Sequence, residues 1–210
     1  MTGLDKLLGG GIAAGIVTDI FGPSGSGKTQ LAMQICVNAI GGKIIFQDPR
    51  GSFRPERVLQ LMQARNLGAE LLDNIIVARP TNTAEQVGHL EKISQIRPTL
   101  VIMEDITDLF SFEYSREENS LEKHKTFMKY MRSVSLLGIQ NKIPIVVTNA
   151  VRETGTQQRE NLDKSISIFT HKKIKLLKGQ HGLVAQVLPS FGARKEIAYK
   201  ITQEGLSEKT

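Results

Sequence analysis

A segment of eight residues near the N-terminus has the residue types that bind phosphate. Residues 22–29 read Gly-Pro-Ser-Gly-Ser-Gly-Lys-Thr, between an apolar strand-like segment and an apolar helix-like one. They match the pattern G-x-x-x-x-G-K-[ST] at every fixed position and in its expected context. Glycines let backbone N–H groups approach phosphate oxygens, and the positive end of the following helix favours the same charge. Lys28 can then contact the β- and γ-phosphates, and the Thr29 hydroxyl can ligate Mg²⁺.

This segment predicts a site for a nucleoside triphosphate, with ATP and Mg²⁺ as the expected ligands. A glycine-rich turn that only caps a helix is the alternative, and the match in both sequence and context argues against it. The expected nucleotide-binding residues in and next to the segment are Gly22, Pro23, Ser24, Gly25, Ser26, Gly27, Lys28, Thr29 and Gln30.

Two acidic residues, Glu104 and Asp105, follow the apolar segment at residues 100–103. A carboxylate at the end of a second buried strand is the usual partner of nucleotide-bound Mg²⁺. Because side chains alternate along a strand, we expect only one of the two to face the nucleotide, and the sequence leaves open which. Lys28, Glu104 and Asp105 are the candidate catalytic residues, and Thr29 with the two carboxylates forms the candidate metal site.

Strand-like and helix-like patterns alternate along the chain, and this alternation predicts an α/β fold. The expected architecture is a central, mostly parallel, twisted sheet with helices on both faces and antiparallel strands at the C-terminal edge. Strands are expected at residues 16–21, 43–47, 74–77, 100–103, 144–148, 168–177, 183–188 and 197–201, and helices at 27–40, 55–65, 84–96 and 117–140. Residues 152–163 are polar with few apolar anchors, and we expect a mobile loop there.

Length and composition favour one globular domain that covers residues 1–210, since 40% of the residues are hydrophobic. No apolar run reaches the ~18 residues that a membrane span needs, and the N-terminus has no secretory signal. We therefore expect a cytoplasmic protein with no membrane partner. The single cysteine, Cys36, is expected to be a small core residue. The net charge of +6 fits a polyanionic partner such as DNA, and equally a well-solvated surface.

The motifs together resemble those of the RecA-like recombinases of the archaeal and eukaryotic type, and especially their short RadA/RadB-like paralogues that consist of the ATPase core. The resemblance covers nearly the whole chain. The segment Gly-Ser-Phe-Arg-Pro-Glu-Arg is the most discriminating, because many other ATPases share the phosphate loop. The matching segments are residues 4–12, 22–30, 51–57, 72–75 and 147–149.

The resemblance implies a P-loop ATPase core of RecA type with ATP-dependent DNA binding, expected on single strands, in homologous recombination and DNA repair. It also implies pairing with itself or with a related recombinase. It places Arg57 near the adenine ring, on which a guanidinium can stack, although a surface helix residue is the alternative.

Two departures from the family pattern concern catalysis. Active recombinases have Asp-Thr-Glu where this chain has Asp48-Pro49-Arg50, and that glutamate activates the attacking water. An arginine cannot accept a proton, so we expect hydrolysis to be slower by ~10²- to 10⁴-fold, with Glu104 or Asp105 as a partial substitute. The family's glutamine after Thr-Asn is Ala150, which has no polar group to sense a γ-phosphate.

The expected DNA loops are altered as well. The first, residues 110–121, contains three glutamates, at positions 113, 117 and 118, against Arg116. The second, residues 152–164, retains basic residues but is short and lacks the paired glycines that the family has at its end. The candidate DNA-binding residues are Arg116, Arg152, Arg159 and Lys164. Lysines at 172, 173, 175 and 178 add charge nearby, either as a solvated strand face or as DNA contacts, with those at 173 and 175 on one face.

Two other functional classes remain open from the sequence. A KaiC-like nucleotide-dependent regulatory protein without DNA binding would explain the acidic first loop, whereas residues 53–57 favour a recombinase. The other class is a protein-interaction module in which bound ATP only stabilises the fold.

Overall fold

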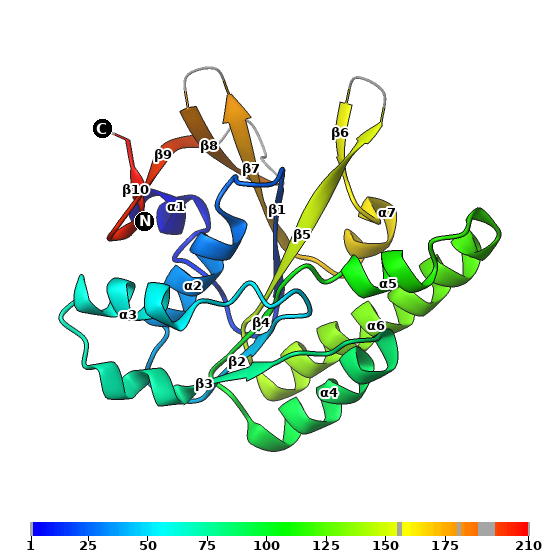
Figure 1. The fold of residues 1–210 in the computed structure, drawn as a ribbon, viewed down its shortest axis with the longest axis horizontal. Coiled ribbons are helices and arrows are strands. Elements are labelled where there is room, and N and C mark those ends of the chain that lie inside the picture. The colour runs from blue at the N-terminus through cyan, green and yellow to red at the C-terminus, as the bar shows by residue number, and fades with distance from the viewer. Residues whose placement is uncertain (1, 155–156, 180–181, 189–195, 210) are drawn as a thin grey trace.

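The computed structural model describes residues 2–154, 157–179, 182–188 and 196–209 (Figure 1). Its helices are α1 (Thr2–Leu7), α2 (Lys28–Asn38), α3 (Pro55–Gln63), α4 (Thr83–Ile96), α5 (Asp108–Glu113), α6 (Ser120–Asn141) and α7 (Asp163–Ile166). Its strands are β1 (Val17–Gly22), β2 (Ile44–Gln47), β3 (Ile75–Ala78), β4 (Leu100–Met103), β5 (Ile145–Thr154), β6 (Gln157–Glu160), β7 (Lys172–Gly179), β8 (Gly182–Leu188), β9 (Glu196–Thr202) and β10 (Gly205–Glu208).

The strands form one sheet in the order β10-β9-β8-β7-β1-β5-β4-β2-β3, and β6 pairs with β5. From β3 to β7 each neighbouring pair is parallel. The remaining pairs, β7 to β10, are antiparallel. The predicted α/β fold of RecA type, with antiparallel C-terminal strands, is therefore confirmed.

Helices cover both faces of the parallel strands, with α2 and α3 on one face and α4 and α6 on the other (Figure 1). Successive residues of one strand therefore belong to two different cores. Ile44 and Phe46 of β2 pack in the core under α2 and α3, while Ile45 packs in the core under α4 and α6. Burial on both faces explains why these strands are almost wholly apolar.

The polar segment after residue 150 is a β-hairpin, so the predicted mobile loop is wrong. Strand β5 continues to Thr154 and pairs with β6, which places Arg152 opposite Arg159. Backbone hydrogen bonds hold this arm, so it needs few apolar side chains. Its base is fixed by Asn161, whose backbone N–H donates to the Ala150 carbonyl. Residues 155 and 156 lie outside the described part of the chain.

The sequence patterns also missed the short elements α1, α5, α7 and β10. Each has six or fewer residues, too few to establish a periodicity. Cys36 is fully buried in α2, as predicted. None of the helices in the described part of the chain combines the length and apolarity needed to cross a membrane.

Candidate nucleotide site

The phosphate loop joins β1 to α2 in a conformation that depends on its glycines. Gly25 and Gly27 have φ of 69° and 94°, a region that other residues rarely adopt. A Cβ added to Gly22 would lie 2.3 Å from the Leu176 carbonyl oxygen. The Ser26 hydroxyl is buried and has no hydrogen-bond partner among the described residues. An unpaired buried polar atom fits a loop that binds a polar ligand.

Lys28 begins α2 and extends back along the loop. Its ammonium group donates to the Gly22 carbonyl at 2.9 Å and to the Pro23 carbonyl at 3.2 Å. Burial lowers the pKa of Lys28, with Asp105 as the strongest opposing influence. Within the described residues Lys28 forms no ion pair. A partly buried cation whose described hydrogen-bond partners are carbonyls fits the phosphate groups of a nucleotide.

Glu104 lies behind the loop, where the Thr29 hydroxyl donates to its Oε1 and the Ser52 hydroxyl donates to its Oε2. Burial raises the pKa of Glu104, against the lowering effect of these two hydrogen bonds. A hydroxyl and a carboxylate in contact are the hard oxygen ligands that Mg²⁺ prefers. No group of three or more acidic, histidine or cysteine residues in the described part could hold a metal alone. That agrees with Mg²⁺ bound partly through phosphates.

Asp105, the second carboxylate, is the one of the two acidic residues that lines the pocket. Strand β4 ends at Met103, and Asp105 has a left-handed φ of 43°. Its backbone N–H donates to the Thr148 hydroxyl at 2.9 Å, which fixes the turn. Asp105 therefore lines the nucleotide pocket while Glu104 contacts Thr29. The left-handed conformation of Asp105 ends the extended backbone of β4, so the alternation of side chains stops there.

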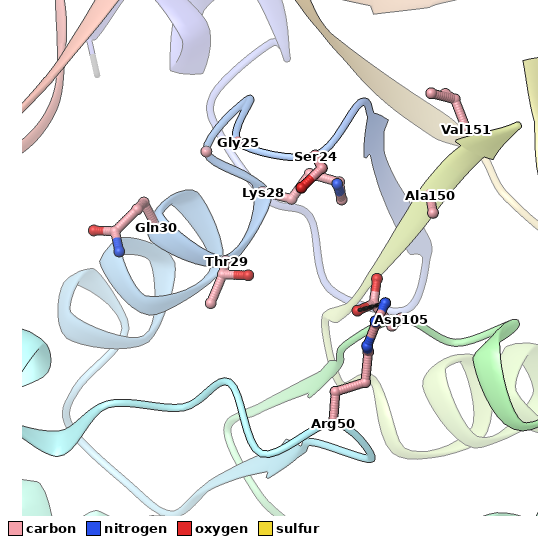
Figure 2. Close-up of a pocket in the computed structure, with 10 residues that line it drawn as sticks. Ser24, Gly25, Lys28, Thr29, Gln30, Arg50, Asp105, Ala150 and Val151 are labelled. Carbon is pink, nitrogen blue, oxygen red and sulfur yellow. Dashed lines mark ion pairs between the residues drawn. The ribbon is translucent and has the colours of Figure 1, made fainter. Parts of the chain in front are cut away.

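The phosphate loop forms one side of a pocket of about 340 Å³, and its opposite side comes from other strands (Figure 2). The loop contributes Ser24, Gly25, Gly27, Lys28, Thr29 and Gln30, and the opposite side contributes Arg50, Asp105, Ala150 and Val151.

Arg50 faces Asp105 across a dashed ion pair in Figure 2. Its Nη1 lies 3.6 Å from Asp105 Oδ2 and 3.8 Å from Asp108 Oδ1. Burial raises the pKa of Asp105, and Arg50 and Lys28 act against that rise. Arg50 and Ala150, at which the sequence analysis found departures from the recombinase pattern, therefore both lie in the pocket wall.

Arg57 is not among the residues that line this pocket. Its guanidinium donates to Gln30 Oε1 at 2.7 Å and to the carbonyls of Thr202 and Gln203 at 2.6 and 2.7 Å. It thus ties α3 to α2 and to the turn between β9 and β10. Its partner Gln30 does line the pocket. The position of Arg57 beside the adenine ring therefore stays a prediction.

The C-terminal strands support the phosphate loop, which the sequence analysis missed. The Tyr199 hydroxyl of β9 donates to the Ser26 carbonyl. The Gln34 side chain of α2 accepts from the Leu206 N–H at 2.6 Å and donates to its carbonyl at 3.2 Å. Lys178 of β7 lies against Gly25, at which an added Cβ would be 2.8 Å from its Nζ. These contacts join residues far apart in the sequence, and no local pattern signals them.

Three of the four predicted DNA-binding residues lie together. Arg152, Arg159 and Lys164 line a second cavity of about 330 Å³, with Lys123 and His124 of α6. Burial and the neighbouring Arg152 lower the pKa of Lys123, as expected where cations are crowded.

The fourth predicted DNA-binding residue, Arg116, is not among the residues that line this cavity. Instead Arg116 lies 3.5 Å from Glu118 in an exposed ion pair. One acidic residue of the first expected loop, Glu113, accepts hydrogen bonds from the backbone N–H and the hydroxyl of Thr83 at the start of α4.

A buried charge cluster behind the second cavity consists of Asp19, Glu160 and Lys173, and we call it the inner cluster. Lys173 Nζ contacts Glu160 and lies 3.3 Å from Asp19 Oδ2. Burial and the nearby Glu160 raise the pKa of Asp19. Burial alone would lower the pKa of Lys173, but the two carboxylates raise it overall. Lys173 is therefore a structural residue and not a solvated strand lysine.

The chain was compared with known proteins. The family model named Rad51 matches residues 1–209. The DNA repair and recombination protein RadA of Cenarchaeum symbiosum is 36% identical over 161 residues, which is 70% of this chain and 40% of that protein. RadA of Metallosphaera sedula is 29% identical over 98% of this chain and 70% of its own length. The DNA repair and recombination protein RadB of Pyrococcus furiosus is 28% identical over 98% of this chain and 92% of its own length.

Proposed function

This chain belongs to the Rad51 family, and on that basis we propose that it is an ATP-binding recombinase paralogue that binds DNA in an ATP-dependent manner during homologous recombination and repair. Residues 1–210 act as one ATPase core in this proposal. The observation that carries it is the nucleotide pocket, in which a complete phosphate loop faces Arg50. The names of the RadA and RadB relatives support the role in repair.

Nucleotide binding rests on the phosphate loop. Its N–H groups and Lys28 would hold the phosphates, and Thr29 with Glu104 would hold Mg²⁺. When bound, Mg²⁺ neutralises charge on the β- and γ-phosphates. The Thr29–Glu104 contact keeps both oxygen donors together at the start of α2.

Slow hydrolysis follows from the opposite wall of the pocket. Arg50 cannot accept a proton from water. Glu104 already accepts hydrogen bonds from two hydroxyl groups. Asp105 is the carboxylate that lines the pocket, and its raised pKa suits a weak residual base, although Arg50 lies within ion-pair distance.

DNA binding is assigned to the second cavity, with Arg152, Arg159 and Lys164 as phosphate contacts and single-stranded DNA as the expected ligand. Salt-dependent retention on single-stranded DNA tests this, because released counterions make phosphate contacts weaken steeply with salt. The Rad51 match favours this proposal over a KaiC-like regulator, which would show no retention. The expected protein partner is a second copy or a related recombinase.

ATP turnover with and without single-stranded DNA, compared between the native protein and Arg50→Glu, tests the catalytic part. We expect slow native turnover, and about 10²-fold faster turnover in the variant if a general base is restored. Arg54→Glu is the matched control, because Arg54 lies in the same turn but does not line the pocket. Fast, DNA-stimulated native turnover would contradict slow hydrolysis and point to Asp105 as an effective base.

A further inference from the structure

Arg50 lines the nucleotide pocket together with Lys28 of the phosphate loop. It follows β2 in a turn that closes at Gly51, which has a φ of 67°. The buried carboxylate of Asp48 anchors this turn by accepting from the N–H groups of Ser52 and Phe53, at 2.9 and 2.8 Å. A turn fixed in this way holds the Arg50 side chain across the pocket from Lys28 (Figure 2).

The present partners of Arg50 hold it weakly. Both ion pairs are long, at 3.6 and 3.8 Å, and 57% of the Arg50 side chain is exposed. Ion pairs of this kind contribute little to stability. A guanidinium binds phosphate more strongly, because two parallel N–H groups can contact two oxygens of one charged group.

We propose that Arg50 is a ligand of the terminal phosphate and makes the site selective for the triphosphate, with Asp105 and Asp108 as its partners when no triphosphate is bound. This inference rests on the proposed nucleotide binding. Arg50, which stands where active recombinases have the catalytic glutamate, thereby has a binding role.

The exchange of partners has a structural consequence. Asp108 is the first residue of α5, and its N–H donates to the Asp105 carbonyl at 2.8 Å. Further along α5, the Ser111 hydroxyl accepts from Asn161, which lines the second cavity, at 2.9 Å. When Arg50 moves to the phosphate, the start of α5 loses its cation. Nucleotide state thus reaches α5 without the glutamine that Ala150 replaces.

The test is the ratio of ATP to ADP affinity, measured by calorimetry with a non-hydrolysable ATP analogue and Mg²⁺. Arg50→Gln should weaken binding of the ATP analogue by about 10- to 100-fold and that of ADP by less than about 3-fold, as expected for loss of charge-assisted hydrogen bonds. Arg50→Lys should give an intermediate loss, because it keeps the charge but not the bidentate geometry. Arg54→Gln, in the same turn, should change neither affinity.

A second variant separates selectivity from general charge. Asp108→Asn removes one resting partner of Arg50 and should strengthen ATP-analogue binding by about 2- to 5-fold relative to ADP. Equal losses for both nucleotides in Arg50→Gln, or no loss in a variant whose thermal unfolding is unchanged, would overturn the inference. Failure of the native protein to bind either nucleotide would instead contradict the proposed function.

Discussion

The nucleotide pocket and the inner cluster each contain a partly buried lysine, and the two lysines have opposite pKa shifts. Burial lowers the pKa of Lys28, and within the described part of the chain its ammonium group donates to two carbonyls, at 2.9 and 3.2 Å. The pKa of Lys173 is raised, because Asp19 and Glu160 together outweigh its burial. Buried charge is costly unless it is paired. Lys173 meets that requirement within the chain, whereas Lys28 leaves it to a ligand.

The largest expected effect is on the inner cluster. Lys173→Met leaves two buried carboxylates without their cation, and breaking a buried pair costs about 3–5 kcal/mol in the free energy of unfolding. Urea denaturation would measure it. Lys175→Met, two residues along the same strand, is the control and should cost far less. Equal losses in the two variants would show that Asp19 and Glu160 do not depend on Lys173.

The pocket lysine should give the reverse result. Lys28→Met should weaken ATP binding by about 10²-fold or more, as for loss of a buried charged contact, while the unfolding free energy without nucleotide changes little. Calorimetry with Mg²⁺ and the ATP analogue would measure the affinity. The control is Lys129→Met on the exposed side of α6. A large stability loss in Lys28→Met would mean that Lys28, like Lys173, stabilises the fold in the absence of a ligand.

The two lysines should also differ in alkaline solution. Lys173, with its raised pKa, stabilises the fold below pH 10.5, and this contribution is lost as pH rises through its folded-state pKa. Lys28, with its lowered pKa, makes the fold less stable at neutral pH, and this penalty disappears as pH rises from its folded-state pKa towards 10.5. Each slope is at most about 1.4 kcal/mol per pH unit, since one proton is involved.

Unfolding of the native protein and of each methionine variant across this pH range would show the difference. The unfolding free energy of the native protein minus that of Lys28→Met should rise with pH just below pH 10.5. The unfolding free energy of the native protein minus that of Lys173→Met should fall as the pH rises above 10.5. Parallel curves would refute the opposite assignments.

The smallest expected effect concerns the support behind the pocket. Tyr199→Phe removes the hydrogen bond to the Ser26 carbonyl and should cost about 1 kcal/mol of stability. ATP affinity should fall only slightly, because the glycine conformations of the loop remain. Thermal unfolding with and without nucleotide would measure both. Tyr114→Phe is the control, since no hydrogen bond of its hydroxyl is found within the described residues.

The sequence predicted the features that depend on local patterns. The phosphate loop and the apolar strands follow from residue types at fixed spacing, and the structure places the loop between β1 and α2. The hairpin arm was missed because its stability comes from backbone pairing and not from apolar periodicity. The sequence named both Glu104 and Asp105 but did not distinguish their positions, because nothing local signals the left-handed conformation of Asp105 after β4.

The inner cluster was missed for a different reason. Lys173 was one of several lysines in a basic stretch, and nothing local distinguishes it from Lys175. Only the register of β7 against β1, with Lys173 beside Asp19, buries it. Burial of a charge is thus decided by which strands become neighbours, and that information is long-range.

Strand β5 is a wall of both cavities. Ala150 and Val151 line the nucleotide pocket, and the next residue, Arg152, lines the second cavity. A strand rises about 3.3 Å per residue, so the two cavities are neighbours along one stiff piece of backbone. A change in the tilt of this strand would therefore move residues in the walls of both cavities together.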